Sequence, residues 1–129
     1  MSEKNDHWIY EEHRNGLRMG YLVKQKLFEG QSAFQKVSVY DTKPHGRMLF
    51  NDDLAMVSER DEFIYHDMIT HPALFIHPNP KRVLVIGGGD GGTAREVMRH
   101  KNVETCVMVE IDQMVIDACL AHIPQTAVA

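Results

Sequence analysis

A glycine-rich loop between a short apolar strand and a helical stretch constrains the fold of this chain more than any other feature. Residues 83–86 read Val-Leu-Val-Ile, and residues 87–92 read Gly-Gly-Gly-Asp-Gly-Gly. A second apolar run, residues 105–111, contains an acid, Glu110, 23 residues after Gly87. This order of parts is typical of a cofactor pocket at the carboxyl end of a parallel sheet. A tight strand-to-helix turn without a ligand is the alternative.

Asp90 is the unusual residue of the loop, because an acid at this place bears on the choice of cofactor. Gly87, Gly89 and Gly92 fit the G-x-G-x-x-G pattern of dinucleotide binders. In such proteins the loop amides face a pyrophosphate, which a carboxylate would repel. A sulfonium nucleoside has no phosphate and carries a positive charge, which Asp90 would attract. We therefore favour an S-adenosylmethionine-type nucleoside over NAD, with Glu110 near the spacing at which an acid meets ribose hydroxyls.

Composition and charge exclude several classes of partner. The chain has 129 residues, of which 43% are hydrophobic and 25% charged, as is typical of soluble globular proteins. A net charge of −4 offers no basic surface for nucleic acid, and no apolar run is long enough to span a membrane. The N-terminus lacks the apolar core of a signal peptide. We expect a cytoplasmic protein in which Cys106 and Cys119 stay reduced rather than forming a disulfide.

The hydrophobic period changes twice along the chain and divides it into three segments. Short alternating stretches in residues 1–57 predict an antiparallel β domain. Residues 58–80 predict a linking helix with Ser58 as its N-cap, bent or ended near Pro72, and a Pro-rich linker. Residues 81–129 predict the first βαβα of a Rossmann-like nucleoside-binding domain. The predicted fold class is therefore α/β.

Three polar residues outside the loop are candidates for ligand contacts. Gln35 shares a strand face with Val37 and Val39, so its amide needs a hydrogen bond if that face is buried. The alternative is a solvent-exposed glutamine at a strand end. Tyr65 and His66 lie on the predicted helix, where ligand contacts and a solvated face are both open.

No metal site is predicted, although histidines and acids are paired on the same helix. Glu62 with His66, and Asp67 with His71, have i, i+4 spacing. The two pairs point more than a right angle apart on a regular helix and cannot converge on one ion.

Three motifs in the chain resemble the spermidine synthase (polyamine aminopropyltransferase) family. They are Glu-Arg-Asp-Glu-Phe-Ile-Tyr-His-Asp-Met at 59–68, Val-Ile-Gly-Gly-Gly-Asp-Gly at 85–91 and Val-Glu-Ile-Asp at 109–112. The resemblance runs from about Trp8 to His122. It implies a small N-terminal β domain, through which a homodimer or homotetramer forms, joined to a Rossmann-like domain of the S-adenosylmethionine methyltransferase type.

The activity that the resemblance implies is the transfer of an aminopropyl group. Decarboxylated S-adenosylmethionine would be the co-substrate, with no tightly bound cofactor, and putrescine the acceptor, giving spermidine and 5′-methylthioadenosine. By position, Gln35 resembles the family's glutamine at the nucleoside site, and Tyr65 and His66 resemble contacts to the polyamine or the aminopropyl arm. Asp90 resembles the carboxylate that holds the aminopropyl amine, and Glu110 the acid that grips both ribose hydroxyls.

The chain departs from the family in its length and at one pocket position. Family members are longer, and the Asp that helps to deprotonate the attacking amine is expected beyond residue 129, so no catalytic residue is predicted here. Two parallel strands would leave open apolar edges, and we expect an N-terminal fragment with little or no turnover alone. Met56 stands where relatives have a glutamine, so a longer polyamine or agmatine could replace putrescine.

Two other functions stay open. A non-catalytic binding or oligomerisation fragment would keep the β domain and associate with a full-length enzyme. Half of an NAD-dependent Rossmann oxidoreductase would bind a dinucleotide at the glycine loop and keep that binding after Asp90→Ala.

Overall fold

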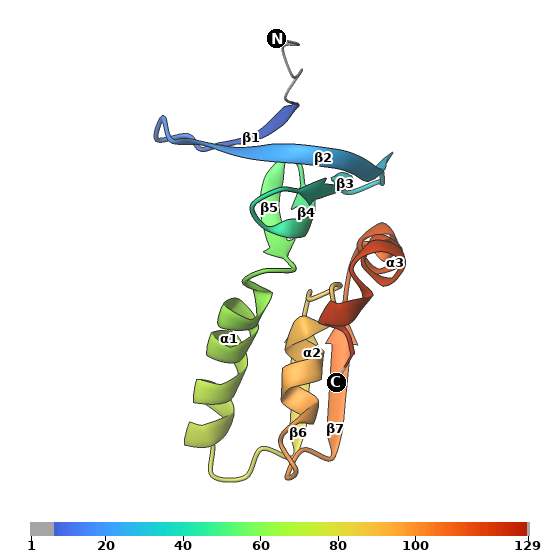
Figure 1. Ribbon diagram of the computed structural model, residues 1–129. Helices are drawn as coiled ribbons and strands as arrows, with labels where there is room; N and C mark the ends of the chain where they lie inside the picture. The colour runs from blue at the N-terminus through green and yellow to red at the C-terminus, as the bar shows by residue number, and fades with distance from the viewer. Residues whose placement is uncertain (1–6, 129) are drawn as a thin grey trace.

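The computed structural model describes residues 7–128 and has two regions, an antiparallel sheet and a set of helices beside two parallel strands (Figure 1). The strands of the antiparallel sheet are β1 (Trp8–Glu12), β2 (Arg18–Gln31), β3 (Lys36–Thr42), β4 (Gly46–Asn51) and β5 (Leu54–Ser58). They pair in the order β1-β2-β3-β4-β5, each antiparallel to its neighbour. This meander follows from alternating side chains and short turns.

The turn between β4 and β5 shows how local sequence fixes this sheet. Asp52 and Asp53 have φ angles of 49° and 65°, a left-handed pair that matches the twist of a two-residue hairpin. Asp52 Oδ1 also accepts a hydrogen bond of 2.9 Å from the Lys36 amide. These two residues therefore form the tight turn that sets the pairing of β4 with β5.

The second region alternates helices with parallel strands. Its elements are α1 (Glu62–Ile76), β6 (Arg82–Ile86), α2 (Gly92–Met98), β7 (Thr105–Val109), α3 (Gln113–His122) and a short 3-10 turn, η1 (Pro124–Thr126). β6 and β7 pair in parallel, with Val85 opposite Met108. The predicted α/β class, an antiparallel domain followed by the start of a Rossmann-like parallel sheet, is confirmed.

The structure corrects the start of the linking helix. Ser58 is the last residue of β5, paired with Met48, and the N-cap of α1 is Asp61. The Ser58 hydroxyl donates to the Asp61 carboxylate at 2.5 Å and accepts from the Asp61 amide at 3.4 Å, so both of its contacts are with the residue just before the first helical one. α1 then continues through Pro72 to Ile76. Strand pairing therefore outweighs the capping signal of a serine followed by acids.

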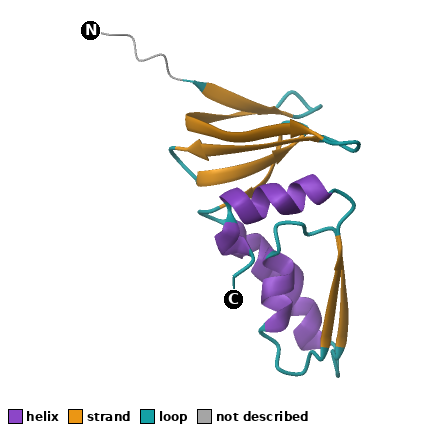
Figure 2. Cartoon of the chain, turned by 90° about the vertical axis from the view of Figure 1, so that its right-hand side faces the viewer, coloured by secondary structure: helices purple, strands orange, loops and turns teal. Residues whose placement is uncertain are grey.

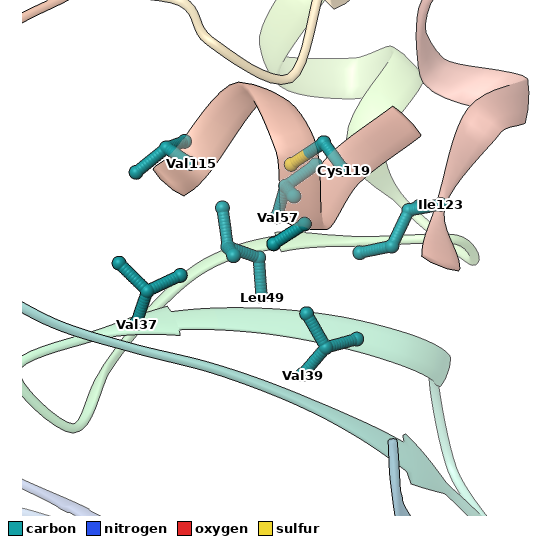
Figure 3. Packing of buried hydrophobic residues seen from close by; sticks show 8 residues of the cluster. Val37, Val39, Leu49, Val57, Val115, Cys119 and Ile123 are labelled. Atoms are coloured by element: carbon teal, nitrogen blue, oxygen red, sulfur yellow. The ribbon is translucent and has the colours of Figure 1, made fainter. Parts of the chain in front are cut away.

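The main hydrophobic core lies between the antiparallel sheet and α3 (Figure 3). The sheet and the α3 segment each contribute four buried residues, which are Val37, Val39, Leu49 and Val57 on one side and Val115, Ala118, Cys119 and Ile123 on the other. Burying a side chain such as Leu49 contributes roughly 1.5–3 kcal/mol. Within residues 7–128, Cys106 and Cys119 are both free, and burial raises the pKa of the Cys119 thiol to about 12.

Figure 2 shows the helices on one side of the parallel pair, and within residues 7–128 no element covers the other side. Leu84 and Ile86 of β6 are 60% and 85% exposed, and Ile76 at the end of α1 is 83% exposed. The predicted apolar edges are thus present. None of the helices within residues 7–128 has both the length and the hydrophobicity to cross a membrane.

Candidate functional site

A pocket of about 500 Å³ lies where the carboxyl ends of β6 and β7 meet α1 and the antiparallel sheet. Ligands commonly bind at this edge of a parallel sheet. The predicted site residues that line the pocket are Tyr65, Gly89, Asp90 and Glu110. Gln35, His66 and Gly87 are not among its lining residues. The structure therefore brings four predicted residues to one cavity and places three behind or beside it.

The glycine loop needs glycine for two different reasons. Gly87 has a φ of 83°, a left-handed conformation that L side chains rarely adopt. At Gly89 a Cβ would lie 2.9 Å from Glu110 Oε2, so a side chain would displace that carboxylate. At Gly92 a Cβ would overlap the His66 ring. The loop therefore needs glycine both for its own backbone conformation and because neighbouring side chains leave no room for a Cβ.

Glu110 follows β7, and two backbone amides orient its carboxylate. Gly89 N–H donates to Oε2 at 3.0 Å, and Asp112 N–H donates to Oε1 at 3.1 Å. A carboxylate oxygen accepts more than one hydrogen bond, so both oxygens keep capacity for a ligand. The pocket wall therefore has two adjacent acceptors, a match for two neighbouring hydroxyl groups.

Asp90 stands at the same wall as a second carboxylate. Its Oδ1 accepts a hydrogen bond of 2.7 Å from the Gly92 amide and lies 3.0 Å from His66 Nε2. Burial alone would raise the pKa of Asp90, but the hydrogen bonds from His66 and Gly92 outweigh burial and hold that pKa below its ordinary value of 3.8. Asp90 is therefore a carboxylate at neutral pH.

His66 lies between two carboxylates and is only 1% exposed. Its Nδ1 is 2.5 Å from Glu62 Oε2, and its Nε2 faces Asp90. Each ring nitrogen needs a proton to bond a carboxylate oxygen, so only the imidazolium satisfies both contacts. Burial alone would lower the pKa of His66, but the bonds to Asp90 and Glu62 outweigh it and raise that pKa above 6.5. A direct contact of His66 with substrate stays a prediction.

Glu62 is held in turn by Arg95 of α2, which sequence reasoning missed. Arg95 Nη1 and Nη2 donate to Glu62 Oε1 and Oε2 at 2.9 Å each, a bidentate geometry. Burial alone would raise the pKa of Glu62, but the bonds from Arg95 and His66 lower it. The i, i+4 spacing of Glu62 and His66 signals the first contact. No local pattern signals a partner 33 residues away.

Two further polar residues of the pocket wall were not predicted from the sequence. Asn51 Oδ1 and Thr70 Oγ1 are buried and have no hydrogen-bond partner within the described part of the chain. Both residues line the pocket beside Met56. Buried polar atoms normally have partners, so these two atoms leave hydrogen-bonding capacity unused beneath the pocket wall. An asparagine at a turn and a threonine in a helix gave no sequence signal.

Gln35 and Tyr65 lie in contrasting environments. Gln35 is half-buried just before β3, and its Nε2 donates to Asp112 Oδ2 at 3.0 Å. Its predicted hydrogen bond is therefore present, with the residue that caps α3. Tyr65 is 60% exposed, and its ring lies edge-to-face with the His66 ring, with centroids 5.4 Å apart. Their contacts with a ligand stay predictions.

One group of metal-ligating side chains occurs within residues 7–128, outside the pocket. Asp67, His71 and Glu96 have ligand atoms within 4.8 Å of one another. The prediction of no metal site compared two residue pairs on a single helix. It could not include Glu96, which lies on α2. Glu96 already binds Arg95 and Arg99 at 2.8 Å each, so its charge is balanced without an ion. We assign no metal to this group, and the absence of a metal site stays a prediction.

Two family models together match most of the chain. A model described as the spermine/spermidine synthase domain matches residues 62–129, and one described as the spermidine synthase tetramerisation domain matches residues 7–59. The polyamine aminopropyltransferase of Methanocaldococcus jannaschii is 47% identical over 97% of this chain and 44% of its own length. That of Alkaliphilus metalliredigens is 51% identical over 91% of this chain and 41% of its own.

Solved structures give the same result. A spermidine synthase from Thermotoga maritima superposes with a TM-score of 0.92 and 37% identity, covering 96% of this chain and 44% of that one. A spermidine synthase in complex with the transition-state analogue AdoDATO gives a TM-score of 0.92 and 38% identity, covering 96% of this chain and 43% of that one. The chain thus spans less than half the length of the relatives it matches.

Proposed function

This chain belongs to the spermine/spermidine synthase family, and we propose that it forms the donor-binding part of an aminopropyltransferase. The donor would be decarboxylated S-adenosylmethionine, and the products would be spermidine and 5′-methylthioadenosine when putrescine is the acceptor. The observation that carries this proposal is that two carboxylates, Asp90 and Glu110, line one pocket at the ends of parallel strands.

The reaction explains why two anionic anchors suffice on this side of the site. The lone pair of an amine attacks the carbon next to the sulfonium, and the C–S bond breaks with its electron pair passing to sulfur. The leaving thioether is neutral, so no acid is needed to expel it. Catalysis instead needs alignment and an unprotonated amine. Glu110 would bind the ribose hydroxyls and Asp90 the ammonium of the aminopropyl group, fixing the donor at both ends.

The acceptor would lie between α1 and the antiparallel sheet. Tyr65 supports this placement because it is exposed and lines the pocket together with Met56. Asn51 and Thr70 belong to the same wall, and their unpartnered side-chain oxygens, which are covered in this structure, would supply polar contacts once acceptor binding uncovers them. Met56 offers no hydrogen bond where a glutamine would, which supports testing agmatine and longer polyamines as well as putrescine.

No residue of this chain is proposed as the base that deprotonates the acceptor. We propose that residues 1–129 alone have little or no turnover, which the exposed apolar side chains of β6 support. A homodimer or homotetramer through the antiparallel sheet is supported by the match of residues 7–59 to the tetramerisation domain. The same match supports a second candidate, an oligomerisation fragment, and co-purification with an intact synthase tests it. A cytoplasmic location and the absence of nucleic-acid partners stay predictions.

Titration calorimetry with the 129-residue chain tests the proposed ligand. We expect 5′-methylthioadenosine and decarboxylated S-adenosylmethionine to bind, and NAD not to bind. Glu104→Gln, at an exposed residue beyond the opposite end of the strands, is the matched control and should leave binding unchanged. NAD binding that persists in Asp90→Ala would contradict the proposal and favour the oxidoreductase alternative.

A further inference from the structure

Four side chains of alternating charge form a continuous line from the interface of α1 and α2 to the pocket. Arg95 donates to Glu62 at 2.9 Å, Glu62 lies 2.5 Å from His66, and His66 lies 3.0 Å from Asp90. The side chains of Arg95, Glu62 and His66 are 10%, 11% and 1% exposed. Only Asp90 lines the pocket. We call these four residues the ion-pair line.

Only one of the two carboxylate oxygens of Asp90 takes part in the ion-pair line. Oδ1 receives both the Gly92 amide and His66 Nε2, and neither bond uses Oδ2. Two donors on one oxygen fix the rotamer of the side chain, because rotation about its bonds would break both contacts. The spared oxygen then has one defined position at the pocket wall, as preorganised binding of a cation requires.

Glu62 has a specific part in this arrangement because a neutral imidazole carries only one N–H. With Glu62 ionised at Nδ1, His66 keeps both protons and always presents a donor to Asp90. Without that charge, the tautomer with its proton on Nδ1 would turn a lone pair toward Asp90 and repel it. Arg95, bidentate to Glu62, fixes the orientation of that carboxylate.

We propose that Glu62 and Arg95 are positioning residues that hold Asp90, through His66, for the ammonium end of the aminopropyl group. The inference rests on the proposed function, because that function supplies the ligand. It places His66 behind Asp90, where it orients this carboxylate. Substitution of Glu62 or Arg95 should therefore weaken the binding only of ligands that carry the aminopropyl amine.

Other groups face the ion-pair line from the elements packed around it. Glu96 of α2 accepts from Arg95 Nε at 2.8 Å, and the Thr126 carbonyl of η1 accepts from Arg95 Nη1 at 2.9 Å. The Tyr65 ring packs against the His66 ring in an edge-to-face arrangement. The cluster contains three carboxylates, those of Glu62, Asp90 and Glu96, and two arginines, Arg95 and the exposed Arg99, which binds Glu96. Loss of the His66 proton would therefore leave three negative charges and only two positive ones. The charge balance of this cluster depends on a protonated His66.

Nitrogen-15 NMR of the His66 ring tests the line without any ligand. We expect both ring nitrogens to carry protons at neutral pH, and Glu62→Gln to lower the pKa of His66 by about one unit, the lower end of what loss of an adjacent opposite charge causes, because Asp90 still faces the ring. Glu104→Gln should leave the titration unchanged. A neutral His66 in the wild type, or a titration that Glu62→Gln does not move, would overturn the proposal.

Calorimetry with two ligands then separates positioning from a merely structural role. Glu62→Gln should weaken decarboxylated S-adenosylmethionine by about tenfold, the order expected for one misplaced charged hydrogen bond, and leave 5′-methylthioadenosine, which lacks the amine, within about twofold. Arg95→Lys, which keeps the charge but loses the bidentate geometry, should give a smaller loss for the same ligand only. Equal losses for both ligands would refute a positioning role. If the wild type binds neither ligand, the proposed function fails, and the NMR titration alone decides whether the line exists.

Discussion

The antiparallel sheet and the parallel β6–β7 region are held together in opposite ways. In the sheet, Val37 and Val39 are fully buried and Leu49 is 2% exposed, whereas Leu84 and Ile86 of β6 are 60% and 85% exposed. Around the pocket, buried polar contacts such as that between Arg95 and Glu62 connect the helices instead. Charged contacts therefore organise the site in the region where apolar packing is weaker. The two regions should therefore respond differently to the same kind of substitution.

The largest expected difference is between two leucines. Leu49→Ala should lower the free energy of unfolding by about 2–5 kcal/mol, because it leaves a cavity in a packed core. Leu84→Ala should change it by about 0.5 kcal/mol or less, since the side chain is already largely in solvent. Urea unfolding of both variants measures this. Equal losses would show that the two regions are packed alike.

The second prediction concerns charge at the pocket. Asp90→Asn should weaken decarboxylated S-adenosylmethionine by about 10- to 100-fold, as expected for a charged hydrogen bond, and change 5′-methylthioadenosine little. Glu110→Gln should weaken both ligands, because both contain the ribose. Calorimetry gives the four dissociation constants. A Glu110→Gln effect restricted to one ligand would argue against ribose binding.

A smaller effect distinguishes two glycines, one from each region. Gly92→Ala should cost about 1–3 kcal/mol, because its Cβ would overlap the His66 ring and overpack the site. Gly16, with a φ of 84° but open space around it, should cost only about 1 kcal/mol as alanine. Thermal unfolding compares them. A harmless Gly92→Ala would mean that His66 has room to move.

The smallest expected effect is the pH dependence of the wild type relative to Glu62→Gln. The pKa of His66 is raised above 6.5 in the folded chain, so its contribution is complete below pH 6.5 and is lost as pH rises through the folded value. The pKa of Glu62 is lowered from 4.5, so its contribution is present above pH 4.5 and is lost as pH falls through the folded value. The stability difference, about 1 kcal/mol, should be greatest between these limits. A difference that is flat from acid to alkaline pH would exclude coupling between these groups.

Local signals predicted much of this arrangement, and long-range contacts account for what they missed. Gly87 to Gly92 lie next to each other in the chain, so the turn, the helix start and the place of Asp90 follow from order alone. Glu110 follows because strand ends of a parallel sheet share an edge. The pairing of Ser58 with Met48 and of Arg95 with Glu62 joins separate elements. No residue pattern near Ser58 distinguishes a helix cap from a strand end.

The two cysteines both lie in the second region, where Cys119 marks the contact of α3 with the antiparallel sheet and Cys106 marks β7. Cys119 is 2% exposed beneath the sheet, and burial raises its pKa to about 12. Cys106 is half-buried in β7, and burial raises its pKa as well. Because only the thiolate attacks an alkylating reagent, Cys119 can be modified only when α3 lifts from the strands above it. The order in which the two thiols react will therefore report whether the contact of α3 with the antiparallel sheet opens before the surroundings of β7 do, with no probe added to the chain.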